Sequence, residues 1–335
     1  MEDDAMSGLR LTLACGDYDR IRALKDGAIR PEGIELNVIP LQPEEIFWRM
    51  IRNEEFDVSE MSTSSYVMER ARGRNRFVAI PVFPSRVFRH GCIFVNSDSG
   101  IEKPTDLVGK RVGVPEYEVT AAVWIRGILQ HEYGVSPEQV HWFSGGIEQP
   151  GRKEKLELRL PPGISLQMIS PTQTLNSMLE SGEIDALATP RIPSSFARGS
   201  SKVRRLFPDY QDVEMDYFRR TRIFPIMHTI VIREEIYRQN RWVAQSLYKA
   251  FCQAKEHCYQ QLYEISALKY SLAWLVPAVE RERELLGPDP WPYGLEANRK
   301  TLETFLQYEV EQGLIDRKLE LESLFAETTL EQYKI

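Results

Sequence analysis

The sequence has few cysteines, and their spacing indicates neither a metal centre nor a redox motif. Four occur among 335 residues, and no two of them form a CxxC pair. Two of the four lie in apolar, strand-like segments, where a reduced thiol behaves as a small hydrophobic side chain. We therefore predict reduced thiols in the protein interior. The four are Cys15, Cys92, Cys252 and Cys258.

The chain also lacks an excess of positive charge and a long apolar run. Its formal net charge is −7, which argues against a nucleic-acid surface but leaves room for a local site that attracts a small anion. No apolar stretch approaches the ~20 residues that span a bilayer. The acidic N-terminus, ahead of a first strand near Leu9, has neither the basic nor the apolar region of a signal peptide. We expect a cytoplasmic protein with no nucleic-acid or membrane partner.

Several motifs that carry chemistry are absent. There is no Walker loop and no GxGxxG segment after a strand, so a phosphate-binding loop is not indicated. No GxSxG elbow is present, which disfavours a serine hydrolase. Without an HExxH motif or histidines paired at helical spacing, the sequence predicts no metal site.

Strand-like and helix-like segments alternate along the chain, which predicts the α/β class. Residues 9–14, 34–41 and the segment beginning at Phe56 are typical of strands, and amphipathic segments separate them. This order predicts mostly parallel sheets with right-handed crossovers, in which ligands lie beyond the carboxyl ends of the strands. A length of 335 residues with 42% hydrophobic residues favours two domains.

Two strand-length segments, each accompanied by a histidine, indicate where the chain crosses between two lobes. One follows His90 and the other contains His228, and a full alternation of strands and helices separates them. Ligand sites form preferentially at domain interfaces, so we expect the active-site cleft between the lobes. The predicted lobe I consists of 1–88 plus 224–335 with the C-terminal helices, and the predicted lobe II consists of 89–223.

Polar side chains at strand ends and at the crossings are the candidate site residues. Arginine forks match carboxylates, the free N–H groups at a helix start attract anions, and imidazoles titrate near neutral pH. Each candidate also has a structural interpretation: a histidine starting an apolar strand is often a buried residue, and Ser62 would cap the following helix. The candidates are His90, His228, Arg86, Arg89, Arg191, Asp17, Tyr18, Ser62, Glu116, Tyr117 and Thr120.

Longer segments resemble a known family over nearly the whole chain. They lie at 11–20, 56–62, 80–86, 88–90, 111–117, 120–127, 223–229, 291–295 and 302–305. Through them the chain resembles the 4,5-dihydroxyphthalate decarboxylase family, cytoplasmic relatives of the type II periplasmic binding proteins. The resemblance implies a two-lobed fold of that kind, with a double crossing between the lobes.

The resemblance further implies a lyase that removes one carboxylate from 4,5-dihydroxyphthalate, giving 3,4-dihydroxybenzoate (protocatechuate) and CO₂. A general acid would protonate the ring carbon that bears the departing carboxylate, and the ring itself would serve as electron sink without a cofactor. We assign His90 and His228 as the acid/base pair. The other assigned roles are carboxylate binding by Arg89 and Arg191, and positioning of the hydroxyls by Asp17, Tyr18, Ser62 and Tyr117.

Three other functions remain open at this point. The same fold would suit a binding protein of the ABC-transporter type for a small aromatic acid, since fold does not imply function. A metal-dependent decarboxylase could draw its ligands from His90, His228, Asp17 and Glu60. A lyase for a related hydroxylated aromatic acid would need only a changed hydroxyl contact.

The C-terminal segment 314–335 would cover its own core or pack on a second subunit, so a homo-oligomer is also open.

Overall fold

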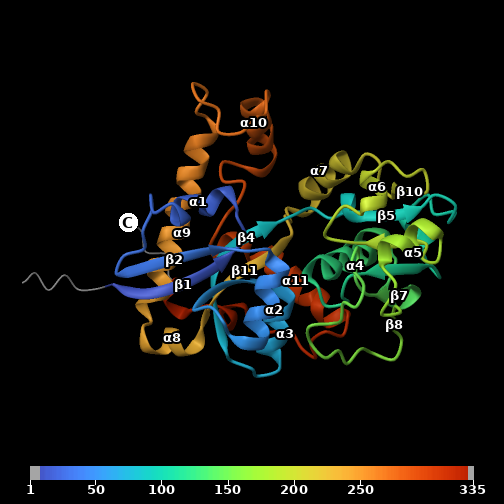
Figure 1. Cartoon of the computed structure of the whole chain (residues 1–335), viewed down its shortest axis with the longest axis horizontal. Coiled ribbons are helices and arrows are strands. Elements are labelled where there is room, and N and C mark those ends of the chain that lie inside the picture. The colour runs from blue at the N-terminus through green and yellow to red at the C-terminus, as the bar shows by residue number, and fades with distance from the viewer. Residues whose placement is uncertain (1–7, 331–335) are drawn as a thin grey trace, which may run out of the picture. The chain divides into compact units, whose positions relative to one another are not determined.

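A computed structural model describes residues 8–330 and divides the chain into two units (Figure 1). Each unit contains a mixed sheet with accompanying helices, so the predicted α/β class is confirmed. Within the described residues, no helix has both the length and the hydropathy needed to cross a membrane. Unit 1 comprises 8–86, 226–299 and 319–330, and unit 2 comprises 87–225 and 300–318.

The sheet of unit 1 consists of β1 (Leu9–Cys15), β2 (Ile34–Pro40), β3 (Val58–Ser62), β4 (Phe77–Arg86) and β11 (Ile226–Arg233). Its strand order is β2-β1-β3-β11-β4. Strands β1, β2 and β3 are parallel, as their alternation with helices predicts. The returning strand β11 is antiparallel to both of its neighbours, β3 and β4. The return crossing therefore places a strand from late in the chain in the middle of an N-terminal sheet.

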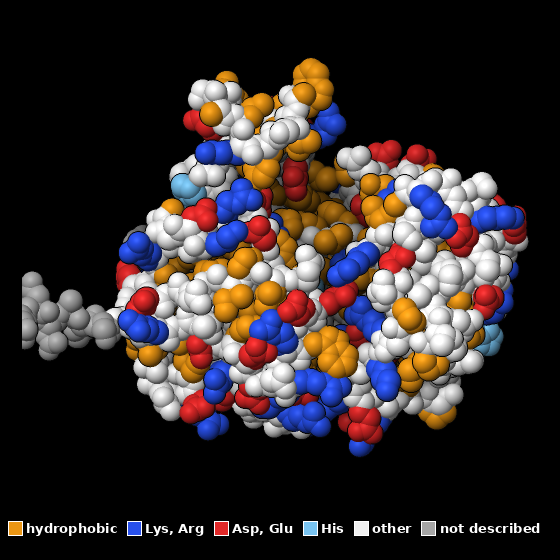
Figure 2. Space-filling view, in the orientation of Figure 1, with side chains coloured by type: hydrophobic (Ala, Val, Ile, Leu, Met, Phe, Trp, Pro, Cys, Tyr) orange, Lys and Arg blue, Asp and Glu red, His pale blue; other side chains and the backbone are white. Residues whose placement is uncertain are grey.

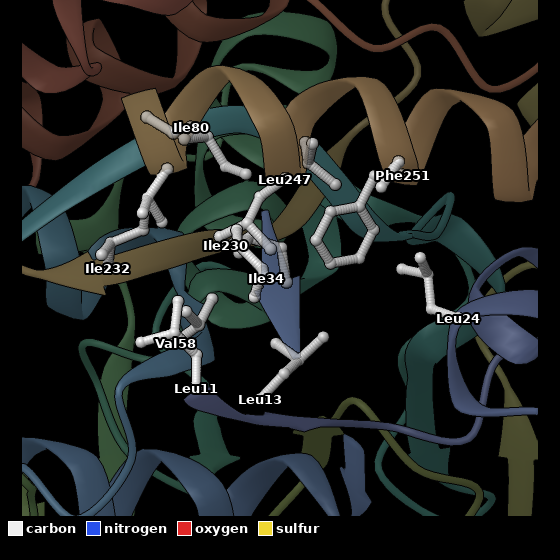
Figure 3. Close-up of a cluster of buried hydrophobic side chains, with 14 of the residues drawn as sticks. Leu11, Leu13, Leu24, Ile34, Val58, Ile80, Ile230, Ile232, Leu247 and Phe251 are labelled. Carbon is white, nitrogen blue, oxygen red and sulfur yellow. The ribbon is translucent and has the colours of Figure 1, made fainter. Parts of the chain in front are cut away.

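Helices and short 3₁₀ turns accompany this sheet. The helices are α1 (Arg22–Lys25), α2 (Pro43–Asn53), α3 (Thr63–Ala71), α8 (Glu234–Gln239), α9 (Trp242–Leu262) and α10 (Leu275–Leu286), and the turns are η1 (Asp19–Ile21), η5 (Glu296–Asn298), η6 (Leu321–Leu324) and η7 (Glu327–Thr329). Figure 3 shows Leu13 and Ile230 of the sheet in one cluster with Leu247 and Phe251 of α9. Burying each such side chain contributes about 1.5–3 kcal/mol, so this cluster anchors α9 to the sheet.

Two segments of unit 1 differ sharply in burial. The C-terminal segment covers the unit's own core: Leu324 and Phe325 are buried, and the Tyr66 hydroxyl donates a hydrogen bond to the Leu324 carbonyl. Residues 319–330 of the segment 314–335 therefore cover the core of unit 1, whereas residues 331–335 lie outside the described range. The alternative of packing on a second subunit stays a prediction. Residues 263–274, between α9 and α10, instead expose several apolar side chains (Figure 2). Trp274 is 78% exposed.

The sheet of unit 2 consists of β5 (Ile93–Asn96), β6 (Arg111–Val114), β7 (His141–Ser144), β8 (Ser165–Met168), β9 (Ala186–Ala188) and β10 (Val203–Arg205). Its strand order is β10-β5-β9-β6-β7-β8. The four strands from β9 to β8 in this order are parallel, whereas β5 is antiparallel to both β9 and β10. The sheet is therefore mostly parallel, as predicted.

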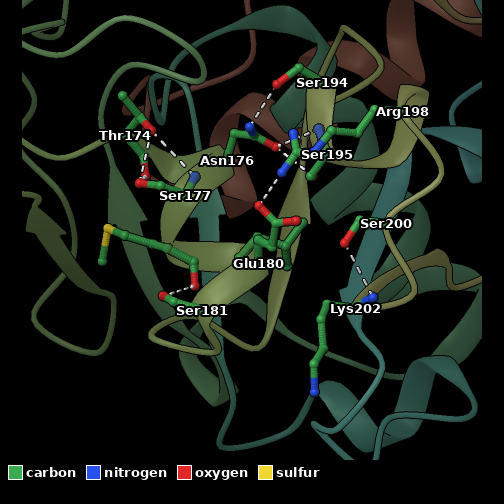
Figure 4. Close-up of polar contacts among 12 residues, drawn as sticks. Thr174, Asn176, Ser177, Glu180, Ser181, Ser194, Ser195, Arg198, Ser200 and Lys202 are labelled. Atoms are coloured by element: carbon green, nitrogen blue, oxygen red, sulfur yellow. Dashed lines mark hydrogen bonds and ion pairs between the residues drawn. The ribbon is translucent and has the colours of Figure 1, made fainter.

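Unit 2 has five helices and three 3₁₀ turns among its described residues. They are α4 (Thr120–Tyr133), α5 (Leu175–Ser181), α6 (Ser194–Ala197), α7 (Tyr210–Thr221), α11 (Arg299–Glu311), η2 (His90–Cys92), η3 (Pro104–Leu107) and η4 (Pro137–Gln139). Polar contacts join α5 to α6, where the Asn176 side-chain oxygen accepts hydrogen bonds from the backbone and the hydroxyl of Ser195 (Figure 4). The hydroxyl of Thr174 accepts from the Ser177 backbone and thereby caps α5 (Figure 4).

Residues 300–318 belong to unit 2, which differs from the predicted division at 88 and 224. Helix α11 packs on α4, where Gly127 permits the approach: a Cβ there would lie 2.0 Å from the Tyr308 ring. The Arg126 side chain donates a hydrogen bond of 2.7 Å to the Gln312 side chain. Only tertiary packing assigns this helix to a unit, because its own amphipathic pattern is satisfied by any apolar partner.

Candidate active site

The central feature of the candidate site is a contact between Glu60 and His228 in unit 1. Glu60 lies on β3 and His228 on the adjacent antiparallel strand β11. The Nδ1 atom of His228 is 2.5 Å from Oε1 of Glu60. The Glu60 side chain is fully buried, whereas the His228 side chain is 18% exposed. The imidazole therefore connects a buried carboxylate with the accessible surface of the unit.

Three further groups donate to the Glu60 carboxylate. The Tyr18 hydroxyl donates to Oε1 at 2.7 Å, and the Gly16 backbone N–H donates to Oε2 at 2.7 Å. The Cys15 thiol lies 3.5 Å from Oε2. Burial alone would raise the pKa of Glu60, but the His228 imidazole and the surrounding donors outweigh burial and hold that pKa below its usual range. Glu60 is therefore ionised at neutral pH.

Two prolines in β4 explain why the sheet is irregular beside His228. The β11–β4 register shifts on both sides of His228, and the larger shift lies between the pairs His228–Ser85 and Ile230–Ile80. Pro81 and Pro84 fall within this stretch of β4 and have no N–H to contribute to the ladder. Irregular ladders of this kind bend a strand and redirect its side chains. At the larger shift the extra residues lie in β4, whereas the pairing of β11 with β3 stays regular from His228 onward.

Aromatic contacts hold the site from two sides. The Arg20 guanidinium lies 4.5 Å from the centroid of the Tyr18 ring and 4.0 Å from that of Trp291. The same guanidinium donates to the Pro84 carbonyl at 2.9 Å, so it ties the Tyr18 ring to β4. The edge of the Phe47 ring packs on the His228 imidazole, with centroids 4.8 Å apart. These contacts restrict the orientations of both side chains.

This arrangement can transfer a proton. An imidazole whose Nδ1 atom is held by a carboxylate has its second ring nitrogen, Nε2, available to give or take a proton. The buried carboxylate stabilises the imidazolium and restricts the ring to one orientation. Of the residues predicted from the sequence, His228 and Tyr18 are brought together here, and Glu60 links them.

The other predicted residues of unit 1 make separate contacts. Asp17 forms an ion pair of 3.1 Å with Lys25. Ser62 caps α3, as its structural interpretation predicts, by accepting from the Ser65 backbone at 3.5 Å. The fully buried Arg86 donates to the Pro292 carbonyl at 2.9 Å and to the Asn298 side chain. Burial lowers the pKa of this guanidinium to about 9. The proposed substrate contacts of Asp17, Ser62 and Arg86 stay predictions.

His90, the second predicted acid/base residue, lies in an aromatic cluster of unit 2. Its ring is 5.3 Å from the ring centroids of both Phe207 and Tyr217, and Tyr133 is at 6.1 Å. The side chain is 1% exposed, and among residues 8–330 neither ring nitrogen has a hydrogen-bond partner. Burial lowers the pKa of His90 to about 4. The imidazole is therefore uncharged at pH 7. Its assigned acid/base role would instead require a pKa close to neutral pH.

Replacing His90 by Phe should make the protein less sensitive to acid. Between pH 6.5 and 4 the unfolded chain binds a proton at His90 that the folded protein excludes, so this residue lowers stability as the pH falls through that window, by about 2–3 kcal/mol. In H90F, whose phenyl ring suits the aromatic cluster, this part of the pH dependence should disappear in urea unfolding curves. Full activity of H90F would support a core role, and a loss of about 10²-fold or more would support the assigned catalytic role.

The remaining predicted residues also lie in unit 2. Glu116 is fully buried and contacts both Arg152 and Lys155. The Tyr117 ring is fully buried beneath the Arg126 guanidinium, at 3.6 Å from the centroid. Both residues thus have partners inside the unit, and their proposed substrate contacts stay predictions. Three others complete the set: Thr120 begins α4, Arg89 is buried with its guanidinium 3.6 Å from the Cys92 sulfur, and Arg191 is exposed after β9.

One group of carboxylates has the proximity that a metal site requires. The carboxylate oxygens of Glu116, Glu118 and Glu154 lie within 4.8 Å of one another. The Lys155 ammonium contacts Glu116 and is 3.0 Å from Glu118, so it already supplies a cation. Burial raises the pKa of Glu154 to about 7, which further reduces the negative charge of the group. The geometry therefore indicates a buried ion-pair network.

The sequence places Glu60 in a polar run at a strand end and offers it as a possible metal ligand, but nothing in the sequence identifies it as the partner of His228. The signal available in the sequence is its place near the end of a strand, before a polar run. The two residues are 168 positions apart, and only the insertion of β11 beside β3 brings them together. Gly16 donates a hydrogen bond to Glu60 through its backbone N–H, and a pattern of side chains in the sequence does not predict such a backbone contact.

Comparison with known proteins identifies relatives along the whole chain. The chain is 41% identical over 330 residues to a 4,5-dihydroxyphthalate decarboxylase of Comamonas testosteroni, which covers 98% of this chain and 100% of that protein. It is 44% identical over 214 residues to one of Pseudomonas putida, covering 64% of this chain and 83% of that protein. Residues 22–149 match the family model described as NMT1/THI5 like.

Solved structures share the fold. The periplasmic aliphatic sulphonate binding protein SsuA from Escherichia coli aligns with a TM-score of 0.54 at 16% identity, covering 97% of this chain and 99% of that one. This likeness confirms the predicted periplasmic-binding-protein-like fold. At 16% identity it carries no information on function. The full-length match to the Comamonas protein settles the family: this chain belongs to the 4,5-dihydroxyphthalate decarboxylase family.

Proposed function

We propose that the chain is a carboxy-lyase that converts 4,5-dihydroxyphthalate to 3,4-dihydroxybenzoate (protocatechuate) and CO₂. The names of the two relatives give the substrate. The observation that carries the chemistry is the 2.5 Å contact between Nδ1 of His228 and Oε1 of Glu60. A histidine oriented by a buried carboxylate is typical of proton transfer, so it favours a lyase over a protein that only binds its ligand.

The reaction needs one proton and no external electrons. A hydroxyl para to the departing carboxylate donates electron density into the ring, and His228 gives its Nε2 proton to the ring carbon that bears this carboxylate. The bond between that carbon and the carboxylate then breaks, and its electron pair restores the aromatic ring as CO₂ leaves. A positioned acid of this kind contributes typically ~10²–10⁴ in rate. The carboxylate-binding roles of Arg89 and Arg191, and the absence of a cofactor, are parts of this proposal.

A turnover assay tests the proposed function. Purified protein treated with EDTA should release CO₂ and protocatechuate in equal amounts from 4,5-dihydroxyphthalate, measured by a CO₂ readout and by chromatography. In D₂O the product should carry one deuterium, at the ring carbon that lost the carboxylate. Turnover that appears only after a divalent ion is added would contradict the metal-free reaction and favour the metal-dependent alternative.

Two other outcomes would overturn the proposal itself. If the substrate raises the melting temperature but no product forms with or without added metal, the result would favour a binding protein or a lyase for a close analogue. If a related hydroxylated aromatic acid is decarboxylated and 4,5-dihydroxyphthalate is not, the reaction type stands and the substrate is wrong. The cytoplasmic location and the homo-oligomer considered from the sequence stay predictions.

A further inference from the structure

We infer that Glu60 fixes His228 in the tautomer that carries its hydrogen on Nδ1, which makes Nε2 the atom that transfers the proton, and that Tyr18 is a positioning residue for this pair. The inference deepens the proposed function and rests on it for the identity of the reaction. The placement of the protons, however, follows from the contacts of the Glu60 carboxylate alone.

Every group around the Glu60 carboxylate can donate a hydrogen bond, and one of these groups cannot accept a hydrogen bond. The Gly16 backbone N–H, 2.7 Å from Oε2, has no accepting capacity. Burial, together with the neighbouring Glu60 charge, raises the pKa of the Tyr18 phenol well above its usual range, so the hydroxyl 2.7 Å from Oε1 keeps its proton. Burial and the same charge raise the pKa of the Cys15 thiol, which remains a weak donor. A carboxylate in this setting is ionised and acts only as an acceptor.

The tautomer of His228 follows from that charge. An ionised carboxylate 2.5 Å from Nδ1 accepts a hydrogen bond, so Nδ1 must carry hydrogen whether the ring is neutral or cationic. Nε2 then holds a lone pair in the neutral ring and a proton in the cation. The neutral ring is a base at Nε2, and the cation is the acid that the proposed reaction requires.

Tyr18 acts on the pair through Glu60. Its hydroxyl donates to the same carboxylate oxygen that accepts from His228, and the Ser85 hydroxyl interacts with the phenol oxygen. The Arg20 guanidinium, 4.5 Å from the ring centroid, holds the ring itself. Because these contacts engage the hydroxyl, the structure favours a positioning role over the substrate contact that the sequence predicts for Tyr18.

The ¹⁵N chemical shifts of the His228 imidazole test the inference without substrate. Assigned by comparison with H228Q, the neutral ring of the wild-type protein should show hydrogen on Nδ1. In Glu60→Gln an amide replaces the acceptor, so we expect a shift toward the Nε2–H tautomer and a fall in kcat of about 10²–10⁴-fold. Glu60→Asp keeps the charge and should keep the tautomer and more of the activity. A wild-type ring with hydrogen on Nε2 would overturn the inference, and that measurement does not depend on whether either Glu60 variant folds.

Tyr18→Phe separates the positioning role from substrate binding. We expect it to keep the Nδ1–H tautomer, with kcat lowered up to about 10-fold and KM unchanged; a raised KM with unchanged kcat would show a substrate contact instead. Glu69→Gln is the matched control, because Glu69 is another fully buried carboxylate of unit 1 that pairs with Arg76 rather than with a histidine. It should leave the His228 spectrum unchanged. If the wild-type protein shows the Nδ1–H tautomer but no decarboxylation, the proposed function fails and the assigned proton placement stands.

Discussion

Replacing His228 by Gln should lower the turnover of 4,5-dihydroxyphthalate by about 10²–10⁴-fold, because the variant has no group that can transfer the proton. Gln has a similar reach and keeps a polar contact with Glu60, so the fold should persist. We expect the loss in kcat rather than in KM, since the proton is needed in the transition state and not for binding. Steady-state assays with chromatographic detection of protocatechuate measure both constants.

His141→Gln is the matched control for this variant. His141 is the first residue of β7 and is exposed. Its replacement should leave kcat and KM unchanged. Wild-type turnover by H228Q, with melting temperatures that match across the three proteins, would contradict the assigned role of His228.

Replacing Lys155 by Met should destabilise the protein by about 3–5 kcal/mol, the typical effect of removing one partner from a buried ion pair. The Lys155 side chain is 2% exposed, and its ammonium contacts the fully buried carboxylates of Glu116 and Glu118. Without it, two carboxylates stay in a low-dielectric interior with less compensating charge. Urea unfolding followed by circular dichroism gives the free energy of unfolding.

Two companion variants make this prediction specific. Lys202→Met removes an exposed ammonium paired with Asp98, so it should hardly change the free energy of unfolding. The double variant Lys155→Met with Glu118→Gln removes one of the two carboxylate charges as well, and it should be more stable than K155M alone. Equal destabilisation of K155M and K202M would show that the buried network contributes nothing beyond a surface pair.

Local sequence patterns were sufficient for the first strands of the fold. The alternation in 9–14 predicts β1, and the segment 34–41 predicts β2, which the structure has at Leu9–Cys15 and Ile34–Pro40. The placement of β11 between β3 and β4, and of α11 in unit 2, had no such local signal. Pairing partners and packing partners depend on residues far apart in the chain, which periodicity within one segment does not report.

The two candidate histidines show that a local sequence pattern does not predict the surroundings of a side chain. His90 and His228 both accompany a strand-length apolar segment and look equivalent in sequence. In the structure one lies among the rings of Phe207 and Tyr217, and the other faces a buried carboxylate. The difference comes from distant segments that happen to pack beside each histidine. Residue type therefore identified the candidates, and only the fold separated their environments.

The most direct test of proton transfer by His228 is a single-turnover measurement with the enzyme in excess over 4,5-dihydroxyphthalate. Rapid quenching follows formation of protocatechuate on the protein, so it isolates the chemical step from product release. We predict that the wild-type step slows in D₂O and that H228Q, although it binds the substrate, is slower by about 10²–10⁴-fold. If H228Q formed product at the wild-type rate, proton transfer by His228 would be ruled out.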